Sequence, residues 1–404
     1  MPWGIRSNHR ALLLAVSASF VLEILAGCGG GSGGGSNSSG STSPLSPLAQ
    51  LGEKIFADPS LSESGAVSCA TCHSPDHALA SAVNEPVPIA GATLGTPGFR
   101  NAPSLRYVDL TPPFSFDSDG APAGGFDRDG RANTLAEQAQ RPFLAEHEMA
   151  NASVTDVSDK LSNAAYASEF TALFGADIFE QPQLAFDRAL SALQQYETED
   201  PDFAPFTSKY DYFLAGKVRL SAAELRGLAL FNNPLKGNCA ACHPSGRGSD
   251  GAAPMFTDFS YDNLGVPRNS AIPANDDPTY FDLGLCGPFR VGLATANDLC
   301  GAFKVPTLRN VALTAPYFHN GRFASLTDAL GFYVRRDTNP EEWYPADSTG
   351  QIHKFDDLPP QYVANVNVTE VPYNRKVGDA PALNSEEIAD VVTFLQTLND
   401  GYQP

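Results

Sequence analysis

Cys69-Ala-Thr-Cys-His73 and Cys239-Ala-Ala-Cys-His243 are two copies of one pattern, and the rest of the chain is organised around them. A Cys-x-x-Cys-His run is the attachment site of a c-type haem. Two thiols three positions apart reach the two vinyl groups of one porphyrin, and the adjacent histidine supplies the proximal imidazole to the iron. The sequence therefore predicts a protein with two covalently bound haems.

The same residue types also suit a zinc knuckle or a redox-active dithiol. Zinc would need two more ligands near each pair, and neither neighbourhood offers a second Cys/His pair. Two copies of the full pattern favour haem over both alternatives. The residues assigned on this basis are the attachment thiols Cys69, Cys72, Cys239 and Cys242 and the proximal ligands His73 and His243.

Length and composition suit a two-domain globular protein. The 404 residues allow one haem in each domain, and a hydrophobic fraction of 42% is enough for two cores. The formal net charge of −20 and the absence of a basic run argue against a nucleic-acid partner. An acidic surface suits a partner protein with a basic docking face, but most acidic surfaces are simply solvated.

Residues 1–28 are typical of a bacterial lipoprotein signal peptide. Arg6 and Arg10 precede an apolar run that is too short and too interrupted for a membrane span. The run ends in Leu25-Ala-Gly-Cys28, which resembles a lipobox, so Cys28 is expected to carry lipid; ordinary cleavage to a free protein is the alternative. Residues 29–47 are rich in Gly and Ser and are expected to form a flexible tether.

This N-terminus predicts a protein of the periplasm, attached by lipid alone to the outer membrane of a Gram-negative bacterium. Of the seven cysteines, Cys286 and Cys300 are left after the lipid and haem sites are assigned. In an oxidising compartment we expect them to form a local disulfide, with two free thiols as the alternative.

Apolar spacing predicts a mainly α protein with long irregular loops around the cofactors and no sustained strands. In each half a short helix precedes the haem motif, and a boundary near 215–216 separates an N-terminal haem domain, 48–215, from a C-terminal one, 216–404. Helices are expected at 48–56, 135–146, 157–174, 184–196, 221–231, 325–335 and from a cap at 384 or 385 to 398.

Further stretches make the chain similar to the bacterial dihaem cytochrome c peroxidase and MauG superfamily, over nearly its whole mature length. The matching stretches are 67–76, 100–105, 129–132, Glu137-Gln138, Glu148-Met149, 304–311 and 317–321. The resemblance implies two cytochrome-c-like domains and a reaction with hydrogen peroxide at the first haem.

The resemblance also implies roles around the first haem. Gln138 and Glu148 match the family's distal polar pair, with Pro142 at the distal wall. Glu148 would move a proton during cleavage of the O–O bond; a solvated charge near a helix end is the alternative. The family's gating histidine would fall near Ile89, in a stretch without histidine, so we expect the first iron to be open or water-bound.

At the second haem, peroxidases of the family use Met as the sixth ligand and MauG-like proteins use Tyr. Tyr333 matches that position, with a core aromatic side chain as the alternative. A phenolate stabilises ferric and higher-valent iron. Arg128 stands where the family has a Trp between the haems. Because arginine is not readily oxidised, electron hopping through this position is not expected.

The superfamily also holds a calcium ion between its domains. The matching positions are Asn101, Thr314 and Pro316, which would contribute amide and carbonyl oxygens together with water. Oxygen ligands suit a hard cation. The resemblance therefore implies one calcium ion beside the two haems.

Together these features predict a MauG-like peroxidase that passes oxidising equivalents to a reductant or to a side chain of a partner protein. One alternative is a conventional cytochrome c peroxidase that detoxifies peroxide with a small electron-donor protein. Another is a dihaem electron carrier without enzymatic activity. The pair Gln138 and Glu148 argues against the carrier, because a carrier needs no proton donor beside an iron.

Overall fold

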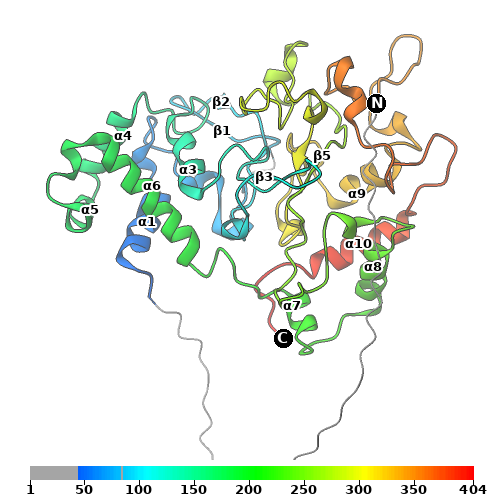
Figure 1. Ribbon diagram of the computed structural model, residues 1–404, viewed down its shortest axis with the longest axis horizontal. Coiled ribbons are helices and arrows are strands. Elements are labelled where there is room, and N and C mark those ends of the chain that lie inside the picture. The colour runs from blue at the N-terminus through cyan, green and yellow to red at the C-terminus, as the bar shows by residue number, and fades with distance from the viewer. Residues whose placement is uncertain (1–43, 83–84) are drawn as a thin grey trace, which may run out of the picture. The chain divides into compact units, whose positions relative to one another are not determined.

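The computed structural model describes residues 44–82 and 85–404, and residues from 44 onward form one compact unit (Figure 1). Helices are its main regular elements, as the apolar spacing predicts. The α-helices are α1 (Pro47–Ala57), α2 (Cys69–Cys72), α3 (Leu135–Leu144), α4 (Val154–Asn163), α5 (Ala167–Phe174), α6 (Pro182–Glu199), α7 (Lys209–Leu214), α8 (Ala222–Asn232), α9 (Leu326–Arg335) and α10 (Ser385–Gln396).

Strands are short, in keeping with the lack of a period-2 pattern. Each strand has two residues and pairs antiparallel with the next in the chain. The pairs are β1 (Ile89–Ala90) with β2 (Thr96–Pro97), β3 (Ser115–Phe116) with β4 (Pro122–Ala123), and β5 (Tyr261–Asp262) with β6 (Phe303–Lys304). Long irregular segments connect these elements, and each haem motif lies in a short helical turn between such segments.

In the first half of the chain, α1 and α6 lie side by side (Figure 1). The contact depends on Gly52, because a Cβ atom at this position would lie 2.0 Å from the carbonyl oxygen of Ala192 on α6. Leu51 and Ile55 of α1 are buried in the same interface. The main hydrophobic cluster of this half uses only residues between 51 and 203.

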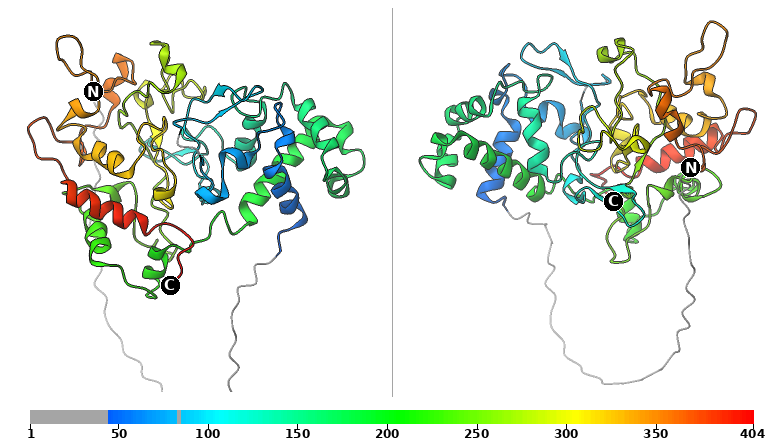
Figure 2. Two further views of the ribbon diagram at one scale, coloured as in Figure 1. Left: turned by 180° about the vertical axis from the view of Figure 1, so that it is seen from behind. Right: turned by 45° about the horizontal axis from the view of Figure 1, so that its top comes forward.

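The second half repeats this arrangement with α8 and α10 (Figure 2). A Cβ atom on Gly227 of α8 would lie 2.1 Å from the carbonyl oxygen of Asp390 on α10. In both halves the helix before the haem motif thus carries a glycine that allows close packing on a later helix. The cluster around α8 and α10 begins at Tyr210, before the expected boundary at 215–216. That boundary remains a prediction.

Helix starts agree closely with the local sequence signals. Ser221 and Glu224 form a reciprocal capping box at the start of α8, and Asn384 and Glu387 form another at α10. Ser325 accepts a hydrogen bond from the amide of Asp328 at α9. These caps depend on residues three positions apart, so the sequence is enough to predict them.

The single helix expected at 157–174 is wrong. The structure has two helices here, because α4 ends at Asn163 and α5 begins at Ala167. The side chains of Ser162 and Asn163 both donate to the carbonyl oxygen of Asp159, at 2.7 Å. Such side-chain bonds compete with the next helical turn. Tyr166 then donates its hydroxyl to Asp58, which holds the turn against the end of α1.

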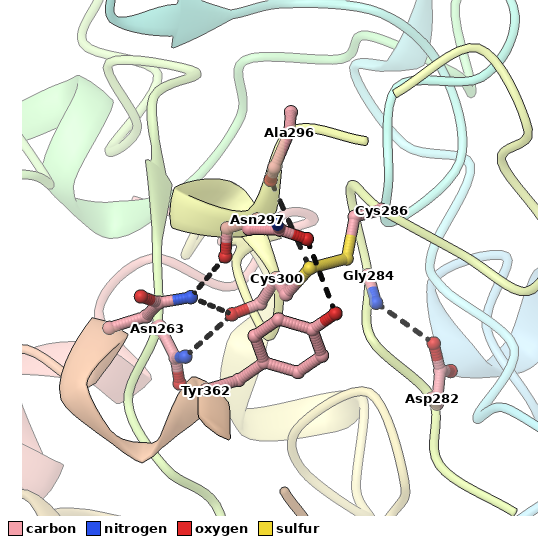
Figure 3. The surroundings of a disulfide bond; sticks show 9 residues. Asn263, Asp282, Gly284, Cys286, Ala296, Asn297, Cys300 and Tyr362 are labelled. Carbon is pink, nitrogen blue, oxygen red and sulfur yellow. Dashed lines mark hydrogen bonds between the residues drawn. A yellow bond between two sulfur atoms is a disulfide. The ribbon is translucent and has the colours of Figure 1, made fainter. Parts of the chain in front are cut away.

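Cys286 and Cys300 form the expected disulfide (Figure 3). The carbonyl oxygen of Cys300 accepts a hydrogen bond from the Asn263 amide at 3.1 Å. On the other side of the bridge, the Asp282 carboxylate accepts from the amide of Gly284 at 3.1 Å. The bridge therefore closes the loop from Cys286 to Cys300, and Asp282 lies just before this loop.

Candidate functional site

The first haem motif occupies α2, a single helical turn that follows α1. Its geometry places Cys69 and Cys72 on one side of the turn, since residues three apart lie on the same helix face. His73 follows directly, and its Nδ1 atom lies 3.1 Å from the carbonyl oxygen of Leu79. Burial lowers the pKa of His73, which favours the neutral imidazole. With Nδ1 bonded to the backbone, Nε2 is the nitrogen left to bind a metal.

The second motif has the same arrangement. Cys239 begins a short 3-10 turn, and the Nδ1 atom of His243 lies 2.7 Å from the carbonyl oxygen of Phe256. Burial lowers the pKa of His243 as well. Cys239, Cys242 and His243 line a cavity of about 220 Å³. The other lining side chains are largely apolar, so the cavity suits a flat apolar group held through two thiols and one imidazole.

These residues fit haem better than zinc or a redox dithiol. Within the described residues, none of the four motif cysteines is paired in a disulfide. Burial raises the pKa of Cys69 and of Cys239 to about 12, whereas a redox-active dithiol needs a thiol of low pKa. In the part of the chain that the structure describes, no group of three or more His, Cys, Asp or Glu side chains could hold a metal ion. A four-ligand zinc site is therefore not formed there.

The predicted distal residues lie on and just after α3. Gln138 and Pro142 are inside this helix, and Glu148 follows its end. Burial and, second to it, the charge of the Glu148 carboxylate raise the pKa of the Cys72 thiol to about 11. Glu148 therefore lies near the first motif. Burial, together with the charge of Asp127, raises the pKa of Glu148 to about 7. A carboxyl group of this pKa can both accept and return a proton near neutral pH.

Four charged or titratable side chains near Glu148 were not singled out for this role from the sequence. Asp127 accepts hydrogen bonds from Arg131 at 3.0 Å and from Arg141 at 2.7 Å. The Gln138 amide lies 3.4 Å from the same carboxylate, which orients it. The Nε2 atom of His147 lies 3.5 Å from Glu148. Arg141, three residues after Gln138 on α3, was the one local signal for this cluster.

Tyr333 is on α9 and lines the cavity of the second motif. Its ring centroid lies 5.6 Å from that of Phe318 and 6.1 Å from that of Tyr373. Burial raises the pKa of the Tyr333 hydroxyl. Tyr373 also lines the cavity, and the sequence analysis missed it because it lies in an irregular segment without periodicity.

Asn101, one of the residues expected to bind calcium, lies against Arg128, and calcium binding at this position stays a prediction. Both of its oxygens accept hydrogen bonds from Arg128, the backbone oxygen at 3.0 Å and the side-chain oxygen at 2.7 Å. Thr314 and Pro316 lie just before Tyr317 and His319, and the His319 carbonyl accepts from the Asn101 amide at 2.8 Å. The segments expected to share an ion thus meet, but Asn101 is already bound to a cationic side chain.

Comparison with known proteins agrees with this geometry. Residues 46–219 match the family model described as di-haem cytochrome c peroxidase. The chain is 34% identical over 364 residues to the methylamine utilization protein MauG of Paracoccus denitrificans, covering 88% of this chain and 90% of that protein. This chain belongs to the di-haem cytochrome c peroxidase family. It is therefore a haem peroxidase, an oxidoreductase with two c-type haems.

Other relatives of this di-haem peroxidase include both named branches of the family. It is 31% identical over 314 residues to the cytochrome c551 peroxidase of Nitrosomonas europaea, covering 76% of this chain and 78% of that protein. Among solved structures, the diheme peroxidase BthA from Burkholderia thailandensis is 40% identical, with a TM-score of 0.81. That match covers 89% of this chain and 87% of BthA. These matches support the fold and the presence of two c-type haems.

The N-terminal predictions lie largely outside the described residues of this peroxidase. Cys28, the signal peptide and the tether up to residue 43 are not described. Pro47, the last expected tether residue, begins α1. Within residues 44–82 and 85–404, no helix is long and apolar enough to cross a membrane.

Proposed function

We propose that this protein is a MauG-like peroxidase with an open first haem and a second haem bound by His243 and Tyr333. Hydrogen peroxide would react at the first haem. The oxidising equivalents would be shared with the second haem and passed to a reductant or to a side chain of a partner protein. The observation that carries the proposal is the position of Tyr333 in the cavity that Cys239 and His243 also line.

The alternative sixth ligand, methionine, is not supported at this cavity. No methionine is among the side chains that line it. Met149 is buried in the hydrophobic cluster of the first half. Met255 is the other methionine of the described chain, and its carbonyl oxygen accepts a hydrogen bond from Thr307. Tyr333 is a hard anionic donor once deprotonated, and such a donor favours the higher oxidation states of iron.

The proton chemistry is assigned to Glu148. A haem held by Cys69, Cys72 and His73 would supply the electrons for cleavage of the O–O bond. Glu148 would accept a proton from the incoming peroxide and return it to the oxygen that leaves as water, which is general acid–base catalysis. Its pKa of about 7 makes both steps accessible at neutral pH. Gln138, held toward Asp127, would donate its remaining amide hydrogen to the bound peroxide.

A conventional cytochrome c peroxidase is the second candidate. The relative in Nitrosomonas europaea carries that name, and the net charge of −20 suits a small donor protein with a basic docking face. This candidate predicts fast turnover with a reduced cytochrome c. It also needs a ligand that closes the first iron at rest, and the stretch 85–98 contains no histidine to provide one.

The decisive experiment is low-temperature EPR of the purified ferric protein. We expect one high-spin and one low-spin haem signal. Tyr333→Phe should change the low-spin signal alone, whereas Tyr373→Phe, which alters the same cavity, should leave the ligand field of the second haem in place. Two low-spin signals in the unmodified protein would favour a gated peroxidase or an electron carrier instead.

We also propose that the protein is lipid-anchored at Cys28 in the periplasm, on the outer membrane. The lipobox-like Leu25-Ala-Gly-Cys28 supports this. Mass spectrometry of the mature N-terminus should find a diacylglyceryl modification on Cys28, and Cys28→Ser should release the protein from the membrane fraction. A membrane-free wild-type protein with an unmodified N-terminus would rule out the anchor.

A further inference from the structure

Arg128 is held in an unusual way for a partly buried arginine. Its guanidinium donates from Nε to the backbone oxygen of Asn101 at 3.0 Å, and from Nη2 to the side-chain oxygen of Asn101 at 2.7 Å. Both acceptors are neutral. In the described ranges, 44–82 and 85–404, Arg128 has no ion pair with a carboxylate, unlike Arg100 or Arg309. Neutral amide and carbonyl oxygens of this kind are also the ligands that a hard metal cation binds in proteins.

The nearby carboxylates are occupied by another arginine. Arg100 binds Asp129 at 2.9 Å and Asp282 through two hydrogen bonds, at 2.5 and 2.7 Å. Burial and the charge of Arg100 lower the pKa of Arg128 to about 10, so Arg128 stays charged at neutral pH. The positive charge of Arg128 is therefore left for another group to balance.

Arg128 connects segments from both halves of the chain at the second haem cavity. Its backbone oxygen accepts from the amide of Lys304 at 2.8 Å, and Asn101 donates its amide to His319 at 2.8 Å. Arg128, Lys304 and His319 all line the cavity of the second motif. A haem carries two propionate carboxylates, so a positive charge beside its cavity reduces the cost of burying them.

We infer that the guanidinium of Arg128 is a built-in cation that replaces the calcium ion at Asn101, so that this chain neither binds nor requires calcium there. A Ca²⁺ ion on the Asn101 side-chain oxygen would sit about 2.3–2.6 Å from it. The guanidinium nitrogen is already 2.7 Å from the same atom. Two buried cations would then lie within a few ångströms of each other, which Coulomb repulsion opposes.

At position 128 this chain differs from the family in two ways. Arginine at 128 removes the oxidisable ring that the family has between its haems, and it also supplies a permanent positive charge. Guanidinium is a suitable replacement because it stays charged, is planar and can donate to two oxygens at once. A chelator could remove calcium, but it cannot remove this charge.

The first test is the metal content of the full-length dihaem protein. After desalting from calcium-containing buffer, elemental analysis should find far less than one calcium per chain. The chelator EGTA should leave the thermal midpoint and the low-spin EPR signal unchanged. One tightly held calcium per chain, or an EPR signal that shifts with EGTA, would overturn the inference.

Variants test whether Arg128 is what excludes calcium. Arg128→Ala frees both Asn101 oxygens, so we expect it to gain one calcium per chain and a thermal midpoint that rises with added calcium. The double variant Arg128→Ala/Asn101→Ala should lose that gain. Lys304→Ala, which removes a different charge from the same cavity, should not bind calcium. Folding of Arg128→Ala only when calcium is present would also support the replacement.

A milder variant covers the case in which Arg128→Ala does not fold under any condition. Arg128→Gln keeps one donor and much of the volume but removes the charge, and it should also gain calcium. If Arg128→Gln, and Arg128→Ala where it folds, bind no calcium, then Asn101 is not a latent calcium site and the inference is wrong. None of these results depends on peroxidase activity, so they can fail independently of the proposed function.

Discussion

The Nδ1 atom of His243 lies 2.7 Å from the carbonyl oxygen of Phe256, thirteen residues further along the chain. His73 has the corresponding contact with Leu79, at 3.1 Å. In each case the backbone carbonyl accepts a hydrogen bond from Nδ1–H, which fixes the tautomer and leaves Nε2 free for iron. Both proximal ligands are thus oriented by the loops that follow their motifs.

His243→Gly should remove the low-spin EPR signal and leave the high-spin signal in place, because only the second iron loses its proximal ligand. Added imidazole should restore a low-spin signal in this variant. His73→Gly is the matched control and should change the high-spin signal instead. Loss of both signals in His243→Gly would mean that the two sites do not form independently.

Glu148→Gln should slow the reaction with hydrogen peroxide by about 10²–10⁴-fold, the usual contribution of a positioned acid–base group. The pKa of Glu148 is about 7, and the carboxylate is the form that accepts a proton. The wild-type rate constant should therefore rise with pH through about 7 and then level off. Stopped-flow mixing with peroxide across this range measures both effects.

Glu146→Gln is the control for this experiment, since Glu146 is an exposed neighbour two residues away. It should keep both the rate and the rise with pH. A Glu148→Gln variant with an unchanged pH profile would show that another group accepts the proton, and His147, 3.5 Å from Glu148, would be the first to replace.

Burial of Glu197 should make the stability of the protein depend on pH. It is buried on α6, with 5% of its surface exposed. Burial, followed by the charge of Asp109, raises its pKa from 4.5 to about 8. Between these values the folded protein holds a proton that the unfolded chain releases. The contribution of Glu197 to the free energy of unfolding is therefore largest below pH 4.5. It falls by about 1.4 kcal/mol per pH unit as the pH rises to 8.

Glu197→Gln should remove this slope, because the amide is neutral at every pH. The measurement is the difference in thermal midpoint between pH 5 and pH 8, for wild type and variant. Glu180→Gln, at an exposed position, should keep the wild-type difference. An equal pH dependence in wild type and Glu197→Gln would contradict the raised pKa.

Removing the disulfide with Cys286→Ala/Cys300→Ala should destabilise the protein by about 3 kcal/mol, the entropy expected for a loop of this length. The two cysteines are 14 residues apart. Asp282, which binds Arg100, lies just before this loop, so the loss of stability should be measured by denaturant unfolding together with the EPR signals. Unchanged unfolding in the double variant would show that the loop is held by its other contacts, such as Asn263 with Cys300.

Local sequence signals predicted much of the fold. Helix starts at Ser221, Ser325 and Asn384 follow from caps that involve residues three apart. Close approach of α1 to α6 was not predictable, because the partner of Gly52 is Ala192, about 140 residues away. The break between α4 and α5 was also missed, since it depends on side-chain bonds that compete with a helix whose apolar spacing continues.

For the site, the sequence by itself determined the two haem motifs, because thiols and imidazole adjacent in the chain define that chemistry without any distant partner. Tertiary structure decided which side chains surround them. Tyr373 faces the second cavity from an irregular segment, and Asp127 gathers Arg131 and Arg141 beside Glu148. The occupant of Asn101 was decided in the same way: a resemblance of residues names possible ligands, but only folding brings the guanidinium of Arg128 onto both oxygens.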